Sequence, residues 1–256
     1  MTKQPTLLAV HAHPDDEAIF TGGLLARAAD LGWQTVVVVA TSGERGLAPT
    51  GDPSHDDSST ARHRRLETLA AAKILGVTHV EFLGYTDSGA EYGDFAPGSL
   101  AAAPITEVVA RVQSVVDTWQ PTLITSYDHQ GIYGHPDHVV VHDVARAVVT
   151  DAGLYESTIS RPALTRLHDR WLALGMSEDT WPRALTQVIG LDHDEPEDLV
   201  AFEVGDYHSR KHAAIAAHDS QIVTAQSFMG LPPGVFHALV ATEWFHCVRS
   251  ATATPF

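Results

Sequence analysis

The sequence is poor in cysteine and in long apolar runs. Its single cysteine, Cys247, cannot form an internal disulfide bond, which fits a reducing compartment and predicts a cytoplasmic protein. The longest strongly apolar run, from Val36 to Ala40, has the length of a strand and is too short to cross a bilayer. The apolar run before His11 is likewise too short for a signal peptide.

Basic residues are also scarce. The chain has 16 lysines and arginines against 32 acidic residues, a formal net charge of −16, which argues against nucleic acid or an anionic membrane as a partner. No GxGxxG motif follows the first predicted strand, and no GxxxxGK[ST] motif is present. The usual signatures of dinucleotide and nucleoside triphosphate binding are therefore missing. We expect a small-molecule partner, and the sequence leaves open whether the chain forms a homo-oligomer.

Strand and helix patterns alternate along the first 150 residues. This order predicts an α/β fold with a Rossmann-like parallel sheet flanked by helices. The predicted strands are Thr6–Val10, Thr35–Ala40, Val80–Leu83 and Thr122–Thr125. The predicted helices are Glu17–Leu31, Thr60–Leu75, Ile105–Trp119 and Val139–Val149.

The C-terminal third has a less regular pattern. Additional strands are predicted at Trp171–Leu174, Gln187–Leu191 and Glu243–Val248, with a helix at Tyr207–Asp219. The chain contains no internal repeat, linker or low-complexity segment. We therefore expect one domain spanning residues 1–256.

Two similar motifs each follow an apolar strand pattern and precede a helix. The first is His13-Pro14-Asp15-Asp16-Glu17 and the second is Gly134-His135-Pro136-Asp137-His138. Strands of an open α/β sheet present such residues at their carboxyl ends, where ligands bind. Imidazoles and carboxylates are donors that a cation such as zinc accepts. The alternative is that each motif only starts a helix, with proline in the first turn and an acidic residue near the helix N-terminus.

These motifs and several others resemble one known family. Thr41-Ser42-Gly43-Glu44-Arg45-Gly46, Arg64-Arg65-Leu66-Glu67, Leu83-Gly84-Tyr85-Thr86-Asp87-Ser88-Gly89 and Ser126-Tyr127-Asp128 occur in the order typical of PIG-L/LmbE-type deacetylases. Members of this family are metal-dependent amidases that remove an acyl group from the amino group of an N-acylated glucosamine unit. The pattern most resembles the actinobacterial mycothiol-type deacetylases and amidases. The stretch from Ser160 to Leu199 matches no part of the family pattern.

The resemblance implies a metal held by His13, Asp16 and His138. Three protein ligands leave a coordination position for water, and the metal can lower the pKa of that water to about 7. We expect Zn2+, and Fe2+ accepts the same ligands. By resemblance and by its place beside a ligand, Asp15 is the general base. The alternative for Asp15 is a helix N-cap.

Three further residues are expected near the reacting atoms. His135, as an imidazolium, would stabilise the oxyanion or protonate the leaving nitrogen, and Asp137 would raise its basicity as an outer partner. Tyr133 matches the position where family members place a phenol near the scissile carbonyl, although a tyrosine of the core would give the same pattern.

Substrate contacts are implied for Arg64 and Asp87, which match family positions that hydrogen-bond the sugar and its aglycone. A guanidinium and a carboxylate suit a polyhydroxylated ligand. For Arg64 the alternative is a solvated helix face, because Arg62, His63 and Arg65 surround it. Of the other histidines, His11 is expected to be a hydrogen-bonded residue at a strand end. His142 is expected in an outer or surface role, and His208 with His212 is a weak candidate metal pair.

The sequence therefore predicts a zinc-dependent N-deacetylase that acts on an N-acylated glucosamine-containing small molecule, with acetyl as the expected acyl group. An amidase that cleaves a larger acyl group is the alternative within this class. A metal-dependent phosphoesterase and a binding module with a decayed site are the alternatives outside it. A phosphoesterase would commonly recruit more carboxylates and a second metal.

Overall fold

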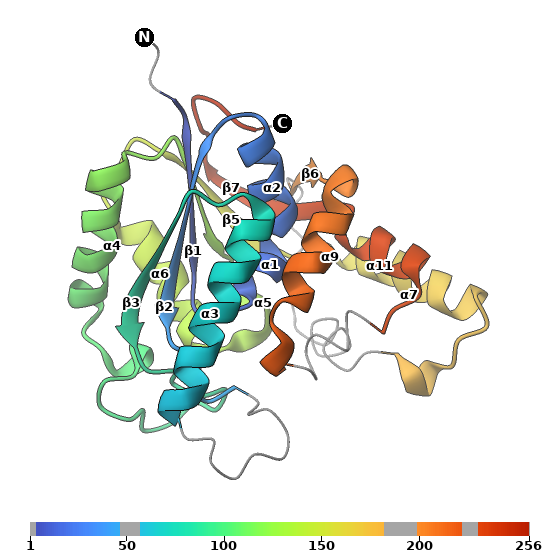
Figure 1. Ribbon diagram of the computed structural model, residues 1–256, viewed down its shortest axis with the longest axis horizontal. Helices are drawn as coiled ribbons and strands as arrows, with labels where there is room; N and C mark the ends of the chain where they lie inside the picture. The colour runs from blue at the N-terminus through green and yellow to red at the C-terminus, as the bar shows by residue number, and fades with distance from the viewer. Residues whose placement is uncertain (1–3, 47–56, 182–198, 222–229, 256) are drawn as a thin grey trace.

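The computed structural model describes residues 4–46, 57–181, 199–221 and 230–255 (Figure 1). Its sheet has seven strands within these residues, in the order β3-β2-β1-β4-β5-β7-β6. The strands are β1 Thr6–His11, β2 Gln34–Thr41, β3 His79–Tyr85, β4 Leu123–Tyr127, β5 Gly153–Thr158, β6 Leu199–Glu203 and β7 Thr242–Arg249.

The pairs formed among β1 to β5 are parallel, whereas β7 runs opposite to both of its neighbours. β1 pairs in parallel with β2 and β4, and β5 continues the parallel sheet beyond β4. β7 pairs antiparallel with β5 and with β6. β1 is buried along its whole length because helices cover both faces of the sheet. The predicted fold class, a parallel α/β sheet with additional C-terminal strands, is confirmed.

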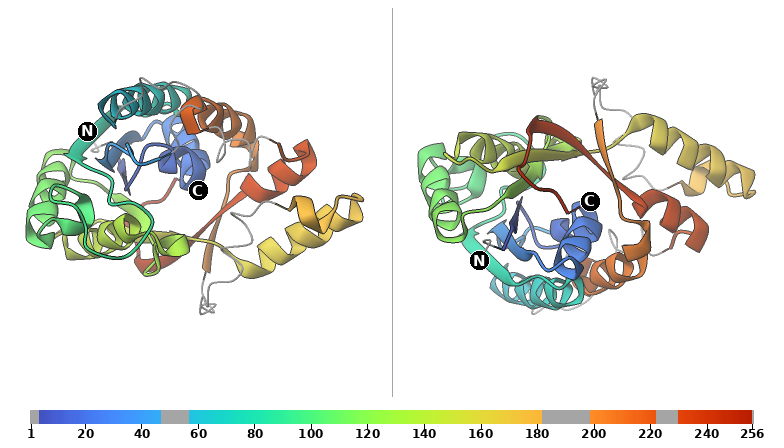
Figure 2. Two further views of the ribbon diagram at one scale, coloured as in Figure 1. Left: turned by 90° about the horizontal axis from the view of Figure 1, so that it is seen from below. Right: turned by 90° about the horizontal axis from the view of Figure 1, so that it is seen from above.

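Two layers of helices enclose this sheet. The helices are α1 Asp16–Phe20, α2 Gly22–Asp30, α3 Asp57–Leu75, α4 Ile105–Trp119, α5 Gly131–Gly134, α6 Pro136–Ala147, α7 Arg161–Ala173, α9 His208–Ala216 and α11 Pro233–Val240. Figure 2 shows α3 beside α9 on one face and α4 with α6 on the other. α7 and α11 pack together at the opposite end of the molecule from α4. Each face has its own apolar cluster, one containing Leu24, Leu75 and Phe245 and the other Val112, Tyr127 and Val144.

The helix predicted over Glu17–Leu31 is interrupted at Thr21, so that prediction is corrected to α1 and α2. Thr21 has φ −131° and ψ 11°, outside the helical region, and its Oγ1 lies 2.8 Å from Nε2 of His11. Gly22 and Gly23 then begin α2. A Cβ atom at Gly23 would lie 2.5 Å from Cγ2 of Val204, so this close approach of α2 requires glycine.

The strand predicted at Trp171–Leu174 is wrong, because these residues end α7. Ser160 accepts a capping hydrogen bond from Ala163 N–H, and Leu164, Leu167 and Trp171 form one buried helical face. Strands β5 and β6 were not predicted. The strand predicted at Glu243–Val248 is confirmed as β7, whereas Gln187–Leu191 lies outside the described residues.

None of the helices in the described parts of the chain is long and apolar enough to cross a membrane.

Candidate active site

The two motifs meet at the carboxyl edge of the sheet. β1 and β4 are hydrogen-bonded neighbours, so the loops that leave them lie side by side. The first loop leads from β1 into α1, which begins at Asp16, and the second passes through α5 into α6, which carries His138. His13, Asp16 and His138 are all buried, although His138 lies more than 100 residues after the other two in the sequence.

Their donor atoms form a nearly equilateral triangle. His13 Nδ1 lies 3.2 Å from His138 Nε2 and 3.5 Å from Asp16 Oδ2, and the latter two atoms are 3.3 Å apart. A tetrahedral cation with bonds of about 2.0–2.1 Å needs its ligands about 3.3 Å apart. The three predicted ligands therefore fit a metal such as zinc. Without a cation, two imidazoles and a carboxylate would crowd together away from water.

Asp137 supports this triangle through His13. The carboxylate of Asp137 accepts hydrogen bonds from Ser88 N–H at 3.0 Å and Ser88 Oγ at 2.5 Å, and its Oδ2 lies 3.2 Å from His13 Nε2. Burial opposes ionisation of Asp137, but the contacts with His13 and Ser88 outweigh it and lower its pKa. A carboxylate on the far nitrogen of a histidine orients that ring toward a metal. The expected pairing of Asp137 with His135 is corrected, because its carboxylate faces His13 instead.

Tyr127 supports the other two ligands. It belongs to the Ser126-Tyr127-Asp128 motif, but no role was predicted for it. Its hydroxyl donates to Asp16 Oδ2 at 2.7 Å and accepts from Ala12 N–H at 2.8 Å. Its ring stacks on His138 with centroids 4.0 Å apart and planes 10° apart. Burial and the adjacent Asp16 raise the pKa of Tyr127 well above its usual value, so the phenol stays a donor. Its place at the end of β4, just before the second motif, is the sequence feature that could have indicated this role.

Asp15 has a strained backbone next to the triangle. Its φ is 104°, a left-handed value that is unusual for aspartate, and its N–H donates to Glu17 Oε2 at 3.1 Å. Asp15 precedes α1 but makes no side-chain capping bond, so the N-cap alternative is not met. Burial raises the pKa of Asp15 to about 6, against the opposing charge of Arg64. A carboxylate with such a pKa is suited to proton transfer near neutral pH.

Arg64 lies behind Asp15 and is 3% exposed, so the solvated-face alternative is wrong. Its Nη2 lies 3.2 Å from Asp15 Oδ2 and also bonds the carbonyl of Pro14, while Nη1 donates to the carbonyl of Gly43. Gly43 has φ +61°, and a Cβ there would meet the guanidinium at 2.4 Å. The glycine thus permits Arg64 to link the loop after β2 to the first motif.

Tyr133 points into the site from the second loop. Its hydroxyl lies 3.3 Å from His138 Nε2, one of the three donor atoms, and 39% of the residue is exposed. The alternative of a core tyrosine is therefore not met. The preceding residue, Ile132, has φ 66°, a strained value for a β-branched residue, and its N–H is held by Asp128 at 2.8 Å.

His135 is the N-cap of α6. Its Nδ1 accepts from Asp137 N–H at 3.2 Å, which leaves the proton of a neutral ring on Nε2. Burial, followed by the nearby His13 and His138, lowers the pKa of His135 to about 4. The expected imidazolium is corrected: at neutral pH this ring is neutral and offers one N–H donor.

Asp87 lies at the edge of the same site. Its Oδ1 is 3.7 Å from His13 Nε2 and accepts from Gly89 N–H at 2.8 Å. Asp87, His13, His135 and Asp137 form a second group that could hold a metal. In that group, however, His13 and Asp137 already contact each other, and His135 Nδ1 already accepts a hydrogen bond. The triangle with Asp16 and His138 is therefore the better metal site.

A residue from the C-terminal part, His218, completes the surroundings of the first motif. Its Nε2 lies 2.7 Å from Glu17 Oε1, and both side chains are buried. Glu17 holds the backbone N–H of Asp15 with its other oxygen, so His218 supports Asp15 through Glu17. Nothing in the sequence near His218 indicated this contact.

The other histidines have structural contacts. His11 is buried, with Nε2 2.8 Å from Thr21 Oγ1 and Nδ1 3.3 Å from the Tyr127 hydroxyl, which confirms a hydrogen-bonded residue at a strand end. Burial lowers its pKa to about 4. His142 pairs with Glu156 at 3.2 Å. His208 and His212 belong to no candidate metal group among the described residues.

Comparisons with known proteins point to one family. Residues 8–149 match the family model described as PIG-L, GlcNAc-PI de-N-acetylase. The 1D-myo-inositol 2-acetamido-2-deoxy-α-D-glucopyranoside deacetylase of Geodermatophilus obscurus is 33% identical, over 99% of this chain and 95% of the relative. A mycothiol S-conjugate amidase of Streptomyces coelicolor is 28% identical, over 99% of this chain and 95% of that relative.

The fold is also similar to that of a solved deacetylase structure. The zinc-inhibited form of teicoplanin deacetylase superposes with a TM-score of 0.64 at 21% identity, covering 97% of this chain and 100% of the other. At that identity the likeness supports the fold alone, whereas the family match covers more than half of the chain and contains both motifs. The chain therefore belongs to the PIG-L family of GlcNAc-PI de-N-acetylases.

Proposed function

We propose that this protein is a metal-dependent hydrolase that removes an acyl group from the amino group of an N-acylated glucosamine-containing small molecule. The observation that carries the proposal is the triangle of His13, Asp16 and His138 with Asp15 beside it. The names of relatives that act on glucosaminyl inositol and mycothiol compounds support this substrate class. A bound Zn2+ or Fe2+ would supply a Lewis acid that favours ionisation of water and polarises the amide carbonyl.

Asp15 is the proton carrier in this proposal. Its carboxylate takes a proton from the attacking water and then delivers it to the leaving nitrogen, which departs as a free amine. The raised pKa of about 6 places Asp15 close to the range in which both transfers are favourable. Arg64 holds one oxygen of this carboxylate and so limits its rotation. Arg64 thereby acts through Asp15, in addition to any contact with the sugar.

Tyr133 and the neutral His135 are the donors to the carbonyl oxygen. The Tyr133 hydroxyl lies beside a ligand atom, and His135 offers an N–H from Nε2. Fixed donors aimed at the position where negative charge develops lower the activation barrier without reorganisation. Desolvation of its hydroxyl inside the site, with Asp16, Asp15 and Asp87 nearby, raises the pKa of Tyr133 well above its usual value, so its proton is retained.

Asp87 is proposed to accept hydrogen bonds from sugar hydroxyls at the edge of the site. Its position beyond His13, on the side of β3, would place the sugar over β2 and β3. We further propose one catalytic domain, a cytoplasmic location and zinc as the first metal to test, because two imidazoles and one carboxylate are typical ligands of catalytic zinc.

The test is a deacetylation assay with metal removed and restored. The chelated protein is loaded with Zn2+ or Fe2+ and mixed with 1D-myo-inositol 2-acetamido-2-deoxy-α-D-glucopyranoside. Acetate and free amine are quantified together, with a phosphomonoester as a control substrate. We expect equal amounts of both products, about one bound metal per chain and no phosphate release. Phosphate release without acetate, or full activity after chelation, would overturn the proposal.

A further inference from the structure

A short segment after α9 reaches the first motif from the C-terminal part of the chain. It comprises His218, Asp219 and Ser220, and it lies outside residues 8–149, which the family model matches. α9 packs against both α1 and α3 (Figure 1), so the end of α9 brings this segment close to the start of α1. The segment is therefore placed to act on Asp15, the proposed proton carrier, which immediately precedes α1.

The side chain of His218 has one hydrogen-bond partner, Glu17, in the part of the chain that the structure describes. Its Nε2 lies 2.7 Å from Glu17 Oε1, and Nδ1 makes no hydrogen bond there. An ionised carboxylate only accepts hydrogen bonds, so the imidazole ring is the donor. Glu17 is fully buried and His218 is 1% exposed, so water does not compete with this contact. His218 therefore acts on its surroundings through Glu17.

Glu17 passes this restraint to the backbone of Asp15. Its second carboxylate oxygen, Oε2, accepts a hydrogen bond from Asp15 N–H at 3.1 Å. Asp15 has φ 104°, a strained value for a residue other than glycine, so its surroundings must hold it there. The side chain leaves the same Cα atom, so a change in φ would move the carboxylate. With one oxygen held by His218, the other oxygen of Glu17 keeps its position under Asp15 N–H.

The segment is anchored on α3, the helix that holds Asp15 from another side. Ser220 donates two hydrogen bonds to Glu67, from its N–H to Oε1 and from its Oγ to Oε2, each 2.6 Å long. Glu67 and Arg64 are three residues apart on α3 and so lie on the same face. Arg64 Nη2 is 3.2 Å from Asp15 Oδ2. His218 and Arg64 thus hold the backbone and the carboxylate of Asp15 from one connected framework.

From these contacts we propose that His218 is a positioning residue that sets kcat by holding the strained backbone of Asp15 through Glu17, and that it contributes to neither metal affinity nor substrate binding. The inference rests on the proposed function, because it takes Asp15 as the proton carrier. A reacting group displaced by about 1 Å can cost about 100-fold in rate. Loss of the His218 contact is therefore expected to lower kcat by about 10–100-fold, with KM and bound metal within about twofold of wild type.

Two substitutions separate the hydrogen bond of His218 from the volume of its ring. Steady-state kinetics are measured with the metal-loaded protein and 1D-myo-inositol 2-acetamido-2-deoxy-α-D-glucopyranoside. His218→Leu cannot donate to Glu17 and should show the full loss of kcat. His218→Gln places an amide N–H near the position of Nε2 and should restore kcat to within about threefold of wild type. His218→Asn is one bond shorter, should behave like His218→Leu, and serves if His218→Leu does not fold.

A double-mutant cycle tests whether His218 acts through Asp15. His218→Leu is combined with Asp15→Asn, and kcat is compared with that of each single variant. If no proton carrier remains to be positioned, the effect of His218→Leu should shrink to less than about twofold in the Asp15→Asn background. A general structural defect would lower kcat by the same factor in both backgrounds, and that result would overturn the proposal.

Hydrogen exchange of the Asp15 amide gives a readout that does not depend on activity. In the metal-free protein this amide should exchange at least about tenfold faster in His218→Leu than in wild type or in His218→Gln, because its acceptor is no longer held. The amide of Leu25, which donates to the Thr21 carbonyl at 2.9 Å, should change by less than about twofold and so reports any general loosening. Unchanged exchange at Asp15 in His218→Leu would also overturn the proposal.

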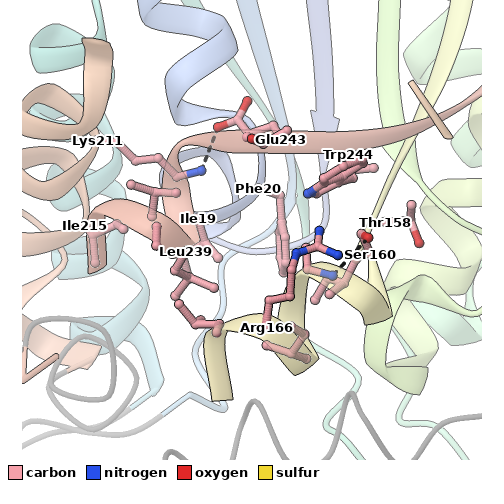
Figure 3. A pocket seen from close by; sticks show the side chains of 18 of the residues that line it. Ile19, Phe20, Thr158, Ser160, Arg166, Lys211, Ile215, Leu239, Glu243 and Trp244 are labelled. Atoms are coloured by element: carbon pink, nitrogen blue, oxygen red, sulfur yellow. Dashed lines mark hydrogen bonds and ion pairs between the residues drawn. The ribbon is translucent and has the colours of Figure 1, made fainter. Parts of the chain in front are cut away.

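The matched control is another buried acid–base pair that joins the C-terminal part to the first helices. Lys211 Nζ lies 2.6 Å from Glu243 Oε1, in the wall of a cavity of 330 Å³ beside α1 and α7 (Figure 3). Glu243 also accepts from Gly23 N–H and Leu24 N–H at the start of α2. Glu243→Gln should lower the stability of the fold but leave kcat and the exchange of the Asp15 amide within about twofold of wild type. An equal loss of kcat in Glu243→Gln and His218→Leu would count against a specific role of His218.

Failure of this inference and failure of the proposed function give different results. If wild type releases acetate and free amine but His218→Leu keeps the wild-type kcat, the positioning role is overturned while the proposed function stands. If wild type hydrolyses no N-acyl glucosaminide, the proposed function fails and the positioning role fails with it.

Discussion

The two halves of the sheet present contrasting surfaces at the same edge. On the parallel half, the ends of β1 and β4 hold buried imidazoles and carboxylates that contact one another within about the distances a metal requires. On the half where β7 runs antiparallel, most of the side chains that line the cavity beside α1 and α7 are apolar. The buried charges of Lys211 and Glu243 there neutralise each other. The amino-terminal region thus supplies chemistry, and the carboxyl-terminal region supplies shape.

Among the substitutions that test this contrast, His138→Ala is expected to have the largest effect on metal binding and turnover. It removes one of the three donors, so both the bound metal and the Lewis acid it supplies should be lost, and turnover should fall by about 10⁴-fold or more. Metal analysis and steady-state rates measure the two losses. His212→Ala, in the carboxyl-terminal region, is the matched control and should retain both within about twofold. Full metal content in His138→Ala would remove this residue from the site.

Asp15→Asn should separate the proton carrier from the ligands. The amide keeps the shape of the side chain but cannot take a proton, so turnover should fall by roughly 10²–10⁴-fold while the metal stays bound. Asp206→Asn, a carboxylate change in the carboxyl-terminal region, should leave turnover unaltered. Metal loss in Asp15→Asn would show that Asp15 is a ligand.

Two buried carboxylates, one from each region, offer a direct comparison. Asp137→Asn weakens the partner of His13 and should raise the dissociation constant of the metal by about 10–100-fold. Glu243→Gln removes half of a buried ion pair and should lower the free energy of unfolding without changing metal affinity. Metal titration and denaturant unfolding are measured on both variants. Equal effects of the two changes on metal affinity would break the contrast.

The smallest effect on activity is expected where the two regions join, at Glu156 of β5. Hydrogen bonding to Glu156 overcomes burial and raises the pKa of His142 above 6.5, while burial of Glu156 is overcome by His142 and Arg146, which lower its pKa below 4.5. The contribution of His142 is present below pH 6.5 and is lost as pH rises through its raised pKa. That of Glu156 is present above pH 4.5 and is lost as pH falls through its lowered pKa.

Glu156→Gln should therefore lower the free energy of unfolding most at about pH 6, by about 2 kcal/mol, and less at pH 3 or pH 9. Arg146 keeps its charge and accounts for the part that remains at high pH. Denaturant unfolding at the three pH values measures this, and turnover should stay within about twofold. A loss of stability that does not vary with pH would show that the pair does not titrate as described.

Local pattern predicted the parallel half well. The helix at Ile105–Trp119 has the predicted bounds, and β1 and β2 extend the predicted strands by only one or two residues. These strands could be predicted because parallel strands are buried on both faces and therefore appear as continuous apolar runs between regularly placed loops. The end of α7 was mispredicted as a strand because its four apolar residues, Trp171–Leu174, fit both the helical and the strand pattern. The packing of Trp171 in the core is what selects the helix.

By itself the sequence determined which residues are candidates for the proposed chemistry: the two motifs predict His13, Asp16 and His138 as metal donors, with Asp15 as their neighbour. Tertiary structure alone decided how these residues are supported. Asp137 faces His13 instead of His135, Tyr127 stacks on His138, and His218 reaches Glu17 from 201 positions away. The physical reason is that donor identity is a property of one side chain, whereas hydrogen-bond partnership and burial depend on which distant segments the fold brings into contact.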